Sequence, residues 1–599
     1  MDPTPEYRER LRLRREAHAA LLIRDARHSY LRLAVFGVLF VMLVLGWRGT
    51  LSFWWLVPPV VVFGWLVQRH DTVIRQRDLA ARAILFYERG VARLEDRWQG
   101  TGEAGDRFVD PHHLYANDLD LFGRGSLFEL LSIARTRAGE EVLAAWLTAP
   151  APPPEIHARR DAIAELTPAL DLREHVALAG TDVRAGIHSD ALVAWAEAPP
   201  VLRQAWPRWV AAMLTAAAIT GGGWWIASGD GGPFVLVVVL EILFSTPLRA
   251  RVDKALHAAD GPARDLDILA HVLLQLEAQR FTSSRLRLLR DSLETQGVVA
   301  SRAIHRLHRL VEWHDWQHNP FFAIIGAALL WGTHIAFAIE HWRRQHGAHV
   351  AVWLHAVAEF EALSSLSTYR FEHPADPFPE IVDTPSAAYE GLELGHPLIP
   401  DSRAVRNDVR LVPPTRLFVV SGSNMSGKST LLRTVGINAV LAFAGAPVRA
   451  RALRLTPLVL GATLRIQDSL QEGRSRFYAE ITRIREIADR AAAPVPVLFL
   501  LDEIFHGTNS HDRLVGASGV LRSLVDRGAI GLITTHDLAL TAVVAELAPR
   551  AQNVHFEDHF EGGEIHFDYR LKPGPVTRSN AIALMRAVGL DVDQGVSHE

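Results

Sequence analysis

Leu417-Phe418-Val419-Val420 leads directly into Gly422-Ser423-Asn424-Met425-Ser426-Gly427-Lys428-Ser429-Thr430, and these residues indicate the fold class of the C-terminal part of the chain. A helical stretch follows, from Leu431 to about Phe443. The pattern G-x-x-x-x-G-K-[ST] between a strand and a helix is typical of a phosphate-binding loop (P-loop). Glycines let backbone N–H groups turn toward phosphates, and a helix N-terminus favours negative charge. We therefore predict that residues 422–430 bind a nucleotide, with Lys428 at the β- and γ-phosphates and Ser429 at Mg²⁺.

Two further apolar runs end in polar residues that suit phosphate chemistry. The run 495–501 is followed by Asp502 and Glu503, and the run 530–535 by His536. Continuous apolar runs are typical of strands buried on both faces of a parallel sheet, and the carboxyl ends of such strands border the ligand crevice. We expect Asp502 to hold Mg²⁺ through water, Glu503 to polarise the attacking water, and His536 to sense or stabilise the γ-phosphate.

Composition supports the role of the lysine and excludes other chemistry. The 599 residues include 63 Lys and Arg against 67 Asp and Glu, so any DNA contact needs a local basic patch rather than a global excess of charge. Lysine occurs only at Lys254, Lys428 and Lys572, and a compact ammonium at position 428 suits a narrow phosphate site better than arginine's planar fork. The absence of cysteine excludes disulfides, Cys-ligated zinc and a thiol nucleophile.

These motifs resemble those of the MutS family of DNA mismatch-repair ATPases. The loop is similar to the family's G-P-N-M-x-G-K-S-T, residues 468–480 to D-x-L-x-x-G-x-S-x-F-x-x-E, residues 502–508 to D-E-I-G-R-G-T, and residues 535–536 to its T-H. Residues 395–397 and 407–408 also fit, and residues 125–163 look like the entry to the family's helical core domain. The resemblance implies an ATP- and Mg²⁺-dependent ATPase that acts as a homodimer and binds DNA, including mismatched DNA.

The sequence also departs from the family pattern. The first 110 residues contain no stretch similar to the family's mismatch-reading domain. Phe505 and His506 replace a Gly-Arg pair, and Asn509 and Ser510 stand where Ser-Thr is usual. In the family this serine region completes the ATP site of the partner subunit. The resemblance therefore implies Asn509 and Ser510 as the trans contacts to the nucleotide, and whether the contact is made in trans stays open.

Two pairs of apolar runs predict helical hairpins in a membrane. The first pair is 33–47 and 51–67, and the second is 209–227 and 234–248. Arginines flank both pairs, whereas the two turns hold only Arg48, so the positive-inside rule predicts that both termini lie in the cytoplasm. Glu241 lies in the fourth run, where it is either a functional intramembrane carboxylate or a residue that faces another helix or is simply tolerated. These features predict a multi-pass protein of the cytoplasmic membrane with about four membrane helices, and a buried soluble hairpin is the alternative for the first pair.

Three other stretches permit more than one interpretation. The apolar run 321–339 is predicted to be a buried core helix, since a single span there would move the ATPase to the opposite side of the membrane. His314 and His318 have a spacing that can bind zinc, but no third ligand is evident. The arginines between Arg280 and Arg309 form a basic stretch that either tracks DNA phosphates or is the solvated face of a lever helix.

The predicted fold class is an α/β P-loop NTPase domain of the ABC/MutS type, preceded by an all-α core and transmembrane hairpins. The predicted domains are an arginine-rich N-terminus (1–30), the first hairpin (31–68), the first part of the core (69–206), the second hairpin (207–248), the second part of the core with its lever (249–384) and the ATPase domain (385–599). The predicted function is a membrane-anchored MutS-like ATPase that couples ATP hydrolysis to dimer closure and DNA binding. The alternatives are a MutS-like clamp on a non-DNA partner and a transport ATPase with fused membrane helices.

Overall fold

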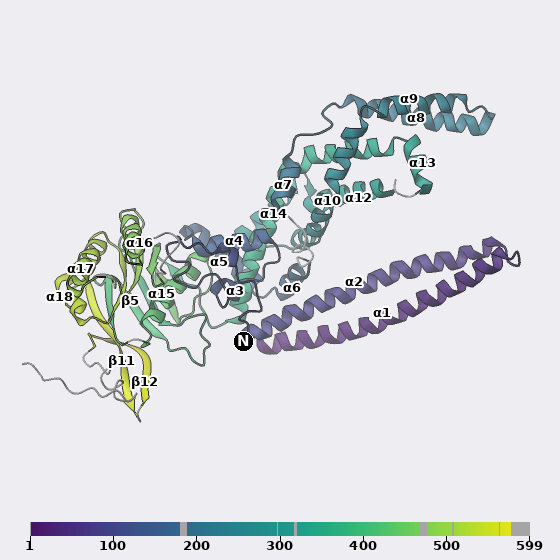
Figure 1. The fold of residues 1–599 in the computed structure, drawn as a ribbon. Coiled ribbons are helices and arrows are strands. Elements are labelled where there is room, and N and C mark those ends of the chain that lie inside the picture. The colour runs from purple at the N-terminus through teal and green to yellow at the C-terminus, as the bar shows by residue number, and fades with distance from the viewer. Residues whose placement is uncertain are drawn as a thin grey trace, which may run out of the picture.

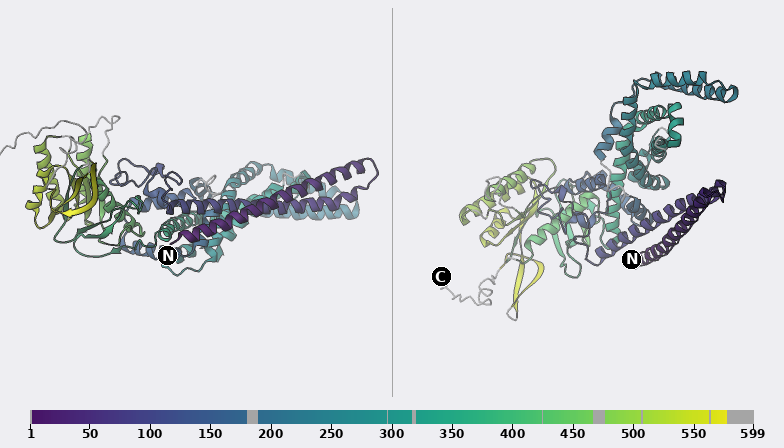
Figure 2. Two further views of the ribbon diagram at one scale, coloured as in Figure 1. Left: turned by 90° about the horizontal axis from the view of Figure 1, so that it is seen from below. Right: turned by 45° about the vertical axis from the view of Figure 1, so that its right-hand side comes forward.

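A computed structural model describes residues 2–179, 189–295, 297–316, 320–423, 425–465, 476–505, 508–561 and 564–576. The chain forms a helical body with two β-sheets at one end and two long helical hairpins at the other (Figure 1). The further views show the same arrangement, with both hairpins extending away from the sheets (Figure 2).

The first hairpin consists of two helices, α1 (Thr4–Trp47) and α2 (Val57–Leu94), which pack along each other and are joined through the short 3-10 helix Phe53–Leu56. Charge pairs one turn apart, such as Arg12 with Glu16 at 2.6 Å, favour helix in the polar first part of α1. The helix then continues without a break into the apolar run. It therefore passes through the predicted limit at residue 30, and α2 likewise passes through the limit at residue 68.

The second hairpin consists of α8 (Trp206–Ser228) and α9 (Gly232–Ser245). Gly229 ends α8 with a φ of 78°, a conformation that glycine adopts without a steric penalty. Glu241 is buried in α9, which packs against α8, as expected for a carboxylate that faces another helix. After α9 the chain turns by 72° into α10 (Arg249–Ala278).

Within the described ranges, two helices, α1 and α8, are long and apolar enough to cross a membrane, and α9 with α10 makes a third if that bent pair counts as one span. The prediction of about four membrane helices is therefore not confirmed. The second predicted run, 51–67, falls short because it begins with the 3-10 helix and a Pro-Pro pair. Its apolar part in α2 then ends at Val67, shortly before Arg69 and Asp71.

The helical body surrounds the 42-residue helix α14 (Trp331–Glu372), which packs against α4, α5, α7, α10, α11 and α12. These and the smaller elements are α3 (Leu127–Leu131), α4 (Arg137–Thr148), α5 (Pro153–Leu166), α6 (Leu170–Ala179), α7 (Ser189–Glu197), α11 (Ser284–Ser292), α12 (Ala300–Asp315), α13 (Pro320–Ala328), the 3-10 helix Asp106–Phe108, and the short strands β1 (Glu294–Thr295) and β2 (Val298–Val299). Most apolar side chains of α14 from Ile335 onward are buried, so this helix is the centre of the helical core.

The prediction that residues 321–339 form a single core helix is wrong. The run is divided between α13 and the first turns of α14, with a break at Leu330, whose φ is 46°. Thr215 of α8 donates to the carbonyl oxygen of Leu329 at 3.1 Å, so the break is supported by a contact from the second hairpin. This contact joins residues that are distant in the sequence, so the apolar pattern of the run does not predict it.

The C-terminal region carries two sheets. The larger sheet has the order β12-β11-β6-β10-β9-β8, in which neighbouring strands are parallel except β11 and β12. Its strands are β6 (Leu417–Ser421), β8 (Val459–Thr463), β9 (Val497–Asp502), β10 (Ile530–Thr535), β11 (Ala551–Glu561) and β12 (Glu564–Pro573). The smaller sheet has the order β3-β7-β4-β5 and consists of β3 (Glu380–Ile381), β4 (Tyr389–Leu394), β5 (Asn407–Leu411) and β7 (Ala452–Leu455).

Helices join the larger sheet to the helical body through one continuous core. Helix α15 (Lys428–Ala444) contacts β9 and β10 of the sheet and also α4 and α5 of the body. Buried residues of both regions, such as Leu119, Leu143, Leu432 and Leu500, belong to the same apolar cluster. The remaining elements are α16 (Arg476–Arg490), α17 (Ser510–Asp526), the 3-10 helix Leu538–Ala542 and α18 (Val543–Leu547). Because the core is shared, α15 cannot shift without disturbing the helical body.

Candidate nucleotide-binding site

Three adjacent parallel strands bring the predicted phosphate-handling residues to one edge of the larger sheet. In the strand register, Thr535 of β10 lies beside Ser421 of β6, and Thr534 lies beside Asp502 of β9. The P-loop, the acidic pair and His536 therefore follow strand ends at the same level. Strand β10 lies between β6 and β9, and this order brings together residues that are more than a hundred positions apart in the sequence.

Backbone geometry explains the glycines of the P-loop. Gly427 has a φ of 102° and precedes α15, whose first residue is Lys428. At Gly422 a Cβ atom would lie 2.9 Å from the Ser426 hydroxyl and 3.1 Å from the Phe556 carbonyl oxygen, so a side chain would crowd the loop. The loop thus places the N-terminus of a 17-residue helix at the sheet edge, an arrangement that suits anion binding.

The Lys428 ammonium lies among acceptors at the centre of the loop. Its Nζ donates to the carbonyl oxygens of Gly422 at 2.8 Å and Ser423 at 2.9 Å, and lies 3.4 Å from Glu503 Oε1. The residue is only 5% exposed. A buried ammonium with several acceptors nearby fits a group that contacts the β- and γ-phosphates of a nucleotide.

Thr534 and His536 of the β10 end orient the acidic pair. The Thr534 hydroxyl donates to the Asp502 carboxylate and accepts the Glu503 N–H at 3.0 Å. Glu503 Oε2 lies 3.4 Å from His536 Nδ1, so its carboxylate lies between His536 and Lys428. Glu503 also has a φ of 47°, an uncommon conformation for a residue other than glycine. Such strain is concentrated at functional sites, where the surrounding contacts hold it in place.

A cavity of about 850 Å³ opens over these residues. Among the predicted site residues, its lining includes Met425, Gly427, Lys428, Ser429, Thr430, Asp502 and Glu503. Its size lies within the usual range for ligand pockets. Asn424 lies outside the described residues. The predicted P-loop and acidic residues are thus brought together around one cavity.

Further residues line the same cavity without having been predicted as site residues. Asn407 accepts the Leu571 N–H at 2.8 Å and donates to the Tyr569 carbonyl oxygen at 2.9 Å, which ties β5 to β12. The Tyr569 ring lies against the P-loop, where a Cβ atom on Gly427 would be 3.1 Å from it. The similarity of residues 407–408 to a family motif was a signal for Asn407. No local pattern marks Tyr569, because strand pairing brings it to the loop.

His396, which also lines the cavity, is held neutral. Burial, with a smaller contribution from Arg433, lowers its pKa to about 4. The Leu398 N–H points to its Nδ1 at 3.3 Å, an arrangement that requires an unprotonated nitrogen there. His396 can therefore offer a neutral N–H donor at its other ring nitrogen across the physiological pH range.

The donor set of the site fits a phosphate group with Mg²⁺. The Ser423 and Ser426 hydroxyls of the P-loop are buried and have no hydrogen-bond partner in the described part of the protein, although neither residue lines the cavity. Ser429 and Asp502 both line the cavity and offer the oxygen ligands that Mg²⁺ prefers. No group of three or more His, Asp or Glu side chains within the described ranges forms a separate metal site.

Asn509 and Ser510, the predicted trans contacts, do not line this cavity. Asn509 caps α17: its side chain accepts the Asp512 N–H at 2.8 Å and donates to the Asp512 carboxylate at 2.7 Å. Ser510 is the first residue of that helix. The side-chain donor of Asn509 is thus engaged within its own chain, which leaves Ser510 as the better candidate for a contact with a partner's nucleotide.

Two candidates from the sequence remain, the basic stretch between Arg280 and Arg309 and the histidine pair at 314 and 318. Within the basic stretch, Arg285 pairs with the buried Glu359 of α14 and therefore serves the helical core. Arg306 and Arg309 lie on α12 and are exposed. His318 lies outside the described residues, so the zinc interpretation of residues 314–318 receives no test.

Comparison with known proteins identifies the C-terminal region. Residues 418–593 match the family model of MutS domain V. The DNA mismatch repair protein MutS 2 of Haloarcula marismortui is 39% identical over 202 residues, which are 33% of this chain and 21% of that protein. The Endonuclease MutS2 of Thermus thermophilus is 35% identical over 203 residues, 34% of this chain and 26% of that protein.

The chain spans only about a fifth to a quarter of the length of these curated relatives. The matched part covers the P-loop, the acidic pair and His536, in a mixed α/β region that follows a helical one. Proteins of the MutS family are ATPases. The predicted fold class is confirmed in a coarser form, as a mixed α/β region of the MutS domain V type that follows a helical region. The P-loop, the strand order and the sequence matches agree, and residues 418–593 are the part of this chain that is similar to MutS domain V.

Proposed function

We propose that the protein is a membrane-anchored, MutS-like ATPase. In this proposal, ATP binding and hydrolysis close a homodimer and move helical levers that hold DNA. The observation that carries the proposal is the convergence of Lys428, Asp502, Glu503 and His536 on the edge of one sheet. Dimer and DNA rest on the family: one relative is named for DNA mismatch repair and the other as an endonuclease.

Each residue of the site has a distinct role in the proposed hydrolysis. Lys428 and the P-loop N–H groups bind the phosphates, and Ser429 and Asp502 would hold Mg²⁺, which when bound would neutralise charge on the phosphates. Glu503 orients the attacking water and accepts its proton at a carboxylate oxygen. Contact with Lys428 and His536 fixes the Glu503 side chain in place. His536 can donate to the γ-phosphate from the same position.

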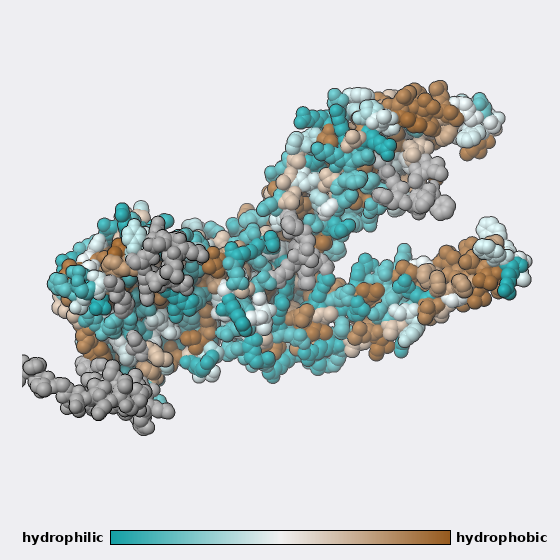
Figure 3. Space-filling view, in the orientation of Figure 1, coloured by the Kyte–Doolittle hydropathy of each residue, from teal (hydrophilic) through white to brown (hydrophobic). Residues whose placement is uncertain are grey.

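The two hairpins support a membrane anchor. Their apolar ends lie on the same side of the protein, remote from the sheets, and form exposed hydrophobic surfaces (Figure 3). Large apolar side chains such as Phe40 and Val41 on α1, and Ile226 on α8, are more than half exposed. Exposed apolar patches of this extent are unusual for a soluble monomer. Arginine-rich flanks support a cytoplasmic location of both termini and of the sheets.

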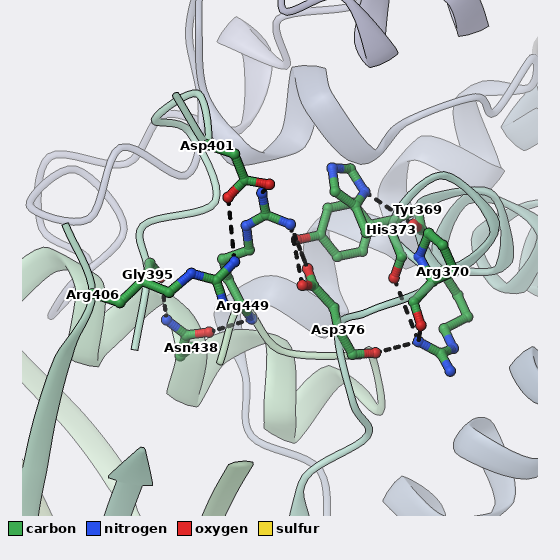
Figure 4. A network of polar contacts seen from close by, with 10 residues as sticks. Tyr369, Arg370, His373, Asp376, Gly395, Asp401, Arg406, Asn438 and Arg449 are labelled. Atoms are coloured by element: carbon green, nitrogen blue, oxygen red, sulfur yellow. Dashed lines mark hydrogen bonds and ion pairs between the residues drawn. The ribbon is translucent and has the colours of Figure 1, made fainter. Parts of the chain in front are cut away.

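A buried polar network supports coupling between the nucleotide site and the lever helix α14 (Figure 4). Asn438, in the P-loop helix α15, accepts the Arg449 N–H at 2.7 Å and donates to the Gly395 carbonyl oxygen at 3.0 Å. The Arg449 guanidinium donates to the Asp376 carboxylate at 3.1 Å, and the Tyr369 hydroxyl of α14 donates to the same carboxylate at 3.2 Å. A shift of α15 would thus reach the end of α14 through hydrogen bonds.

The same end of α14 is joined to the first hairpin. Glu372 accepts two bonds of 2.7 Å from Arg93 of α2 and one of 3.1 Å from the Tyr7 hydroxyl of α1. Glu372 is the last residue of α14 and lies four positions before Asp376. The nucleotide site, the lever and the base of the first hairpin therefore meet at one buried joint, which we define as Glu372, Asp376, Arg93 and Arg449.

The proposal is tested with the full-length protein in detergent or nanodiscs and a labelled DNA duplex, with and without a mismatch. Glu503→Gln is expected to bind ATP, lose turnover and retain DNA in an ATP-dependent manner, whereas Lys428→Ala loses nucleotide binding and serves as the control. Absence of ATP hydrolysis by the wild type would refute the ATPase. Glu503→Gln turning over at the wild-type rate would refute the role of Glu503. An ATP-dependent dimer that ignores DNA would favour the clamp on a non-DNA partner.

A further inference from the structure

A second cavity, of about 630 Å³, lies at the base of the second hairpin. Arg208, in the first turn of α8, lines it together with Arg306 and Arg309 of α12. The opposite lining comes from α14 and includes Trp342 and His346. Helices α8, α12 and α14 thus converge on one hollow with three guanidinium groups.

The positive charge of this cavity is not neutralised within the described ranges. Arg208, Arg306 and Arg309 are exposed, and none has a carboxylate within 4.0 Å in that part of the chain. His346 is only 6% exposed, and its Nδ1 has no hydrogen-bond partner there. Arg285, from the same basic stretch, is by contrast neutralised by Glu359. A buried polar atom without a partner, beside three unpaired guanidinium groups, is the composition of an anion site.

The position of the cavity relative to the hairpin indicates where that anion comes from. From Arg208 to Ser228, helix α8 rises about 30 Å at about 1.5 Å per residue, which equals the thickness of a bilayer's hydrocarbon core. If α8 spans, Arg208 lies at the cytoplasmic headgroup level. Trp313 lines the cavity, and its carbonyl oxygen accepts the indole N–H of Trp331 at 2.7 Å. Tryptophans gather at this level of membrane proteins.

We propose that this cavity binds the phosphate group of an anionic phospholipid from the cytoplasmic leaflet. Arg208, Arg306 and Arg309 donate charge-assisted hydrogen bonds to the phosphate, His346 binds it from the buried side, and Trp313 packs at the boundary between headgroup and acyl chains. This inference rests on the proposed membrane anchor. It assigns a lipid class to the second hairpin, which neither the family match nor the relatives' names provide.

The test measures retention of labelled phosphatidylglycerol against phosphatidylcholine by the full-length protein in neutral detergent. The test variant is Arg306→Gln/Arg309→Gln. Its matched control is Arg287→Gln/Arg290→Gln, which removes the same charge at the same spacing from exposed arginines of α11 in the same basic stretch. Each arm is repeated with excess inorganic phosphate and with single-stranded DNA as competitors. Basal ATP hydrolysis and resistance of the membrane-bound protein to alkaline carbonate extraction are measured for every variant.

We expect preferential retention of phosphatidylglycerol, reduced at least about tenfold in the test variant and within about twofold of wild type in the control. Basal ATP hydrolysis and carbonate resistance should be unchanged in both. Equal retention of the two lipids, or an unaffected test variant, would overturn the lipid site. Displacement by inorganic phosphate would instead identify a free-phosphate site, and displacement by DNA a nucleic-acid site. Complete extraction by carbonate would refute the membrane anchor itself, separately from these outcomes.

Discussion

Glu372→Gln is predicted to loosen the joint between α14 and the first hairpin. The Glu372 side chain is 1% exposed and Arg93 is 9% exposed, and two hydrogen bonds of 2.7 Å join them. The substitution removes the negative charge and leaves a guanidinium buried without its counterion. Breaking a buried pair in this way costs about 3–5 kcal/mol. Tyr7 loses part of the same interaction, because its hydroxyl donates to Glu372 at 3.1 Å.

Hydrogen–deuterium exchange of the full-length protein measures this loss locally. Backbone amides near the hairpin base, residues 5–14 and 84–94, exchange through local opening, so their rates report its free energy. A change of about 3–5 kcal/mol corresponds to roughly a hundredfold to four-thousandfold increase in exchange rate, at about 1.4 kcal/mol per tenfold. The apolar tip of the hairpin, residues 33–47, should change little.

Arg8→Ala is the matched control, since Arg8 pairs with Glu95 at the same hairpin base but its side chain is 63% exposed. Exposed pairs contribute about 1 kcal/mol or less, so exchange at the base should rise by less than about tenfold. Equal protection in Glu372→Gln and wild type would refute the reasoning that the buried pair holds the hairpin to α14. Equal loosening in both variants would show that burial does not distinguish the two pairs.

Three further predictions concern the nucleotide site and the topology. The free energy of local opening of residues 389–411, measured by hydrogen exchange, should fall by about 3 kcal/mol between pH 7 and pH 4, and much less in His396→Gln. The reason is that burial lowers the pKa of His396 to about 4, so the unfolded chain takes up the proton first as the pH falls below about 6.5. An identical pH dependence in the wild type and the variant would contradict this. A reporter fused after Glu599 should be active only in the cytoplasm and one inserted at Gly229 only outside, and an external C-terminus would refute the two-hairpin topology. Mixtures of Lys428→Ala and Ser510→Ala chains should hydrolyse ATP in a non-linear relation to the mixing ratio if Ser510 acts in trans, whereas strict additivity would indicate that each chain works alone.

The site residues that could be predicted from the sequence lie in short contiguous motifs. The P-loop needs glycines and Lys428 at fixed spacing between a strand and a helix, and the acidic pair needs only a buried strand before it. Tyr569 and Asn407 could not be found in this way as a pair, because their contact depends on the arrangement of β12 and β5. Pairing between distant strands is decided by the whole sheet rather than by local pattern.

The helical region shows the same limit of local reasoning. Hydropathy identified the apolar segments, but it gave no reason to expect that α1 continues through its charged half into the apolar run as one 44-residue helix. Charge pairs along α1 and packing against α2 sustain that helix well beyond its apolar part. In the opposite direction, the run 321–339 is largely apolar yet breaks at Leu330, next to Leu329, which the second hairpin contacts. Tertiary contacts decided both outcomes.

Helix α14 connects the nucleotide site to both hairpins. Its last residue, Glu372, lies in the joint that reaches the P-loop helix through Asp376 and Arg449. Its first turns contact α8 of the second hairpin, and His346 between the two ends lines the basic cavity. A continuous, mostly buried helix transmits displacement rather than absorbing it, since close-packed cores resist deformation. A change of the P-loop on nucleotide binding would therefore act on both hairpins together, and an anchored hairpin would in turn affect nucleotide affinity, because coupling between binding sites is reciprocal.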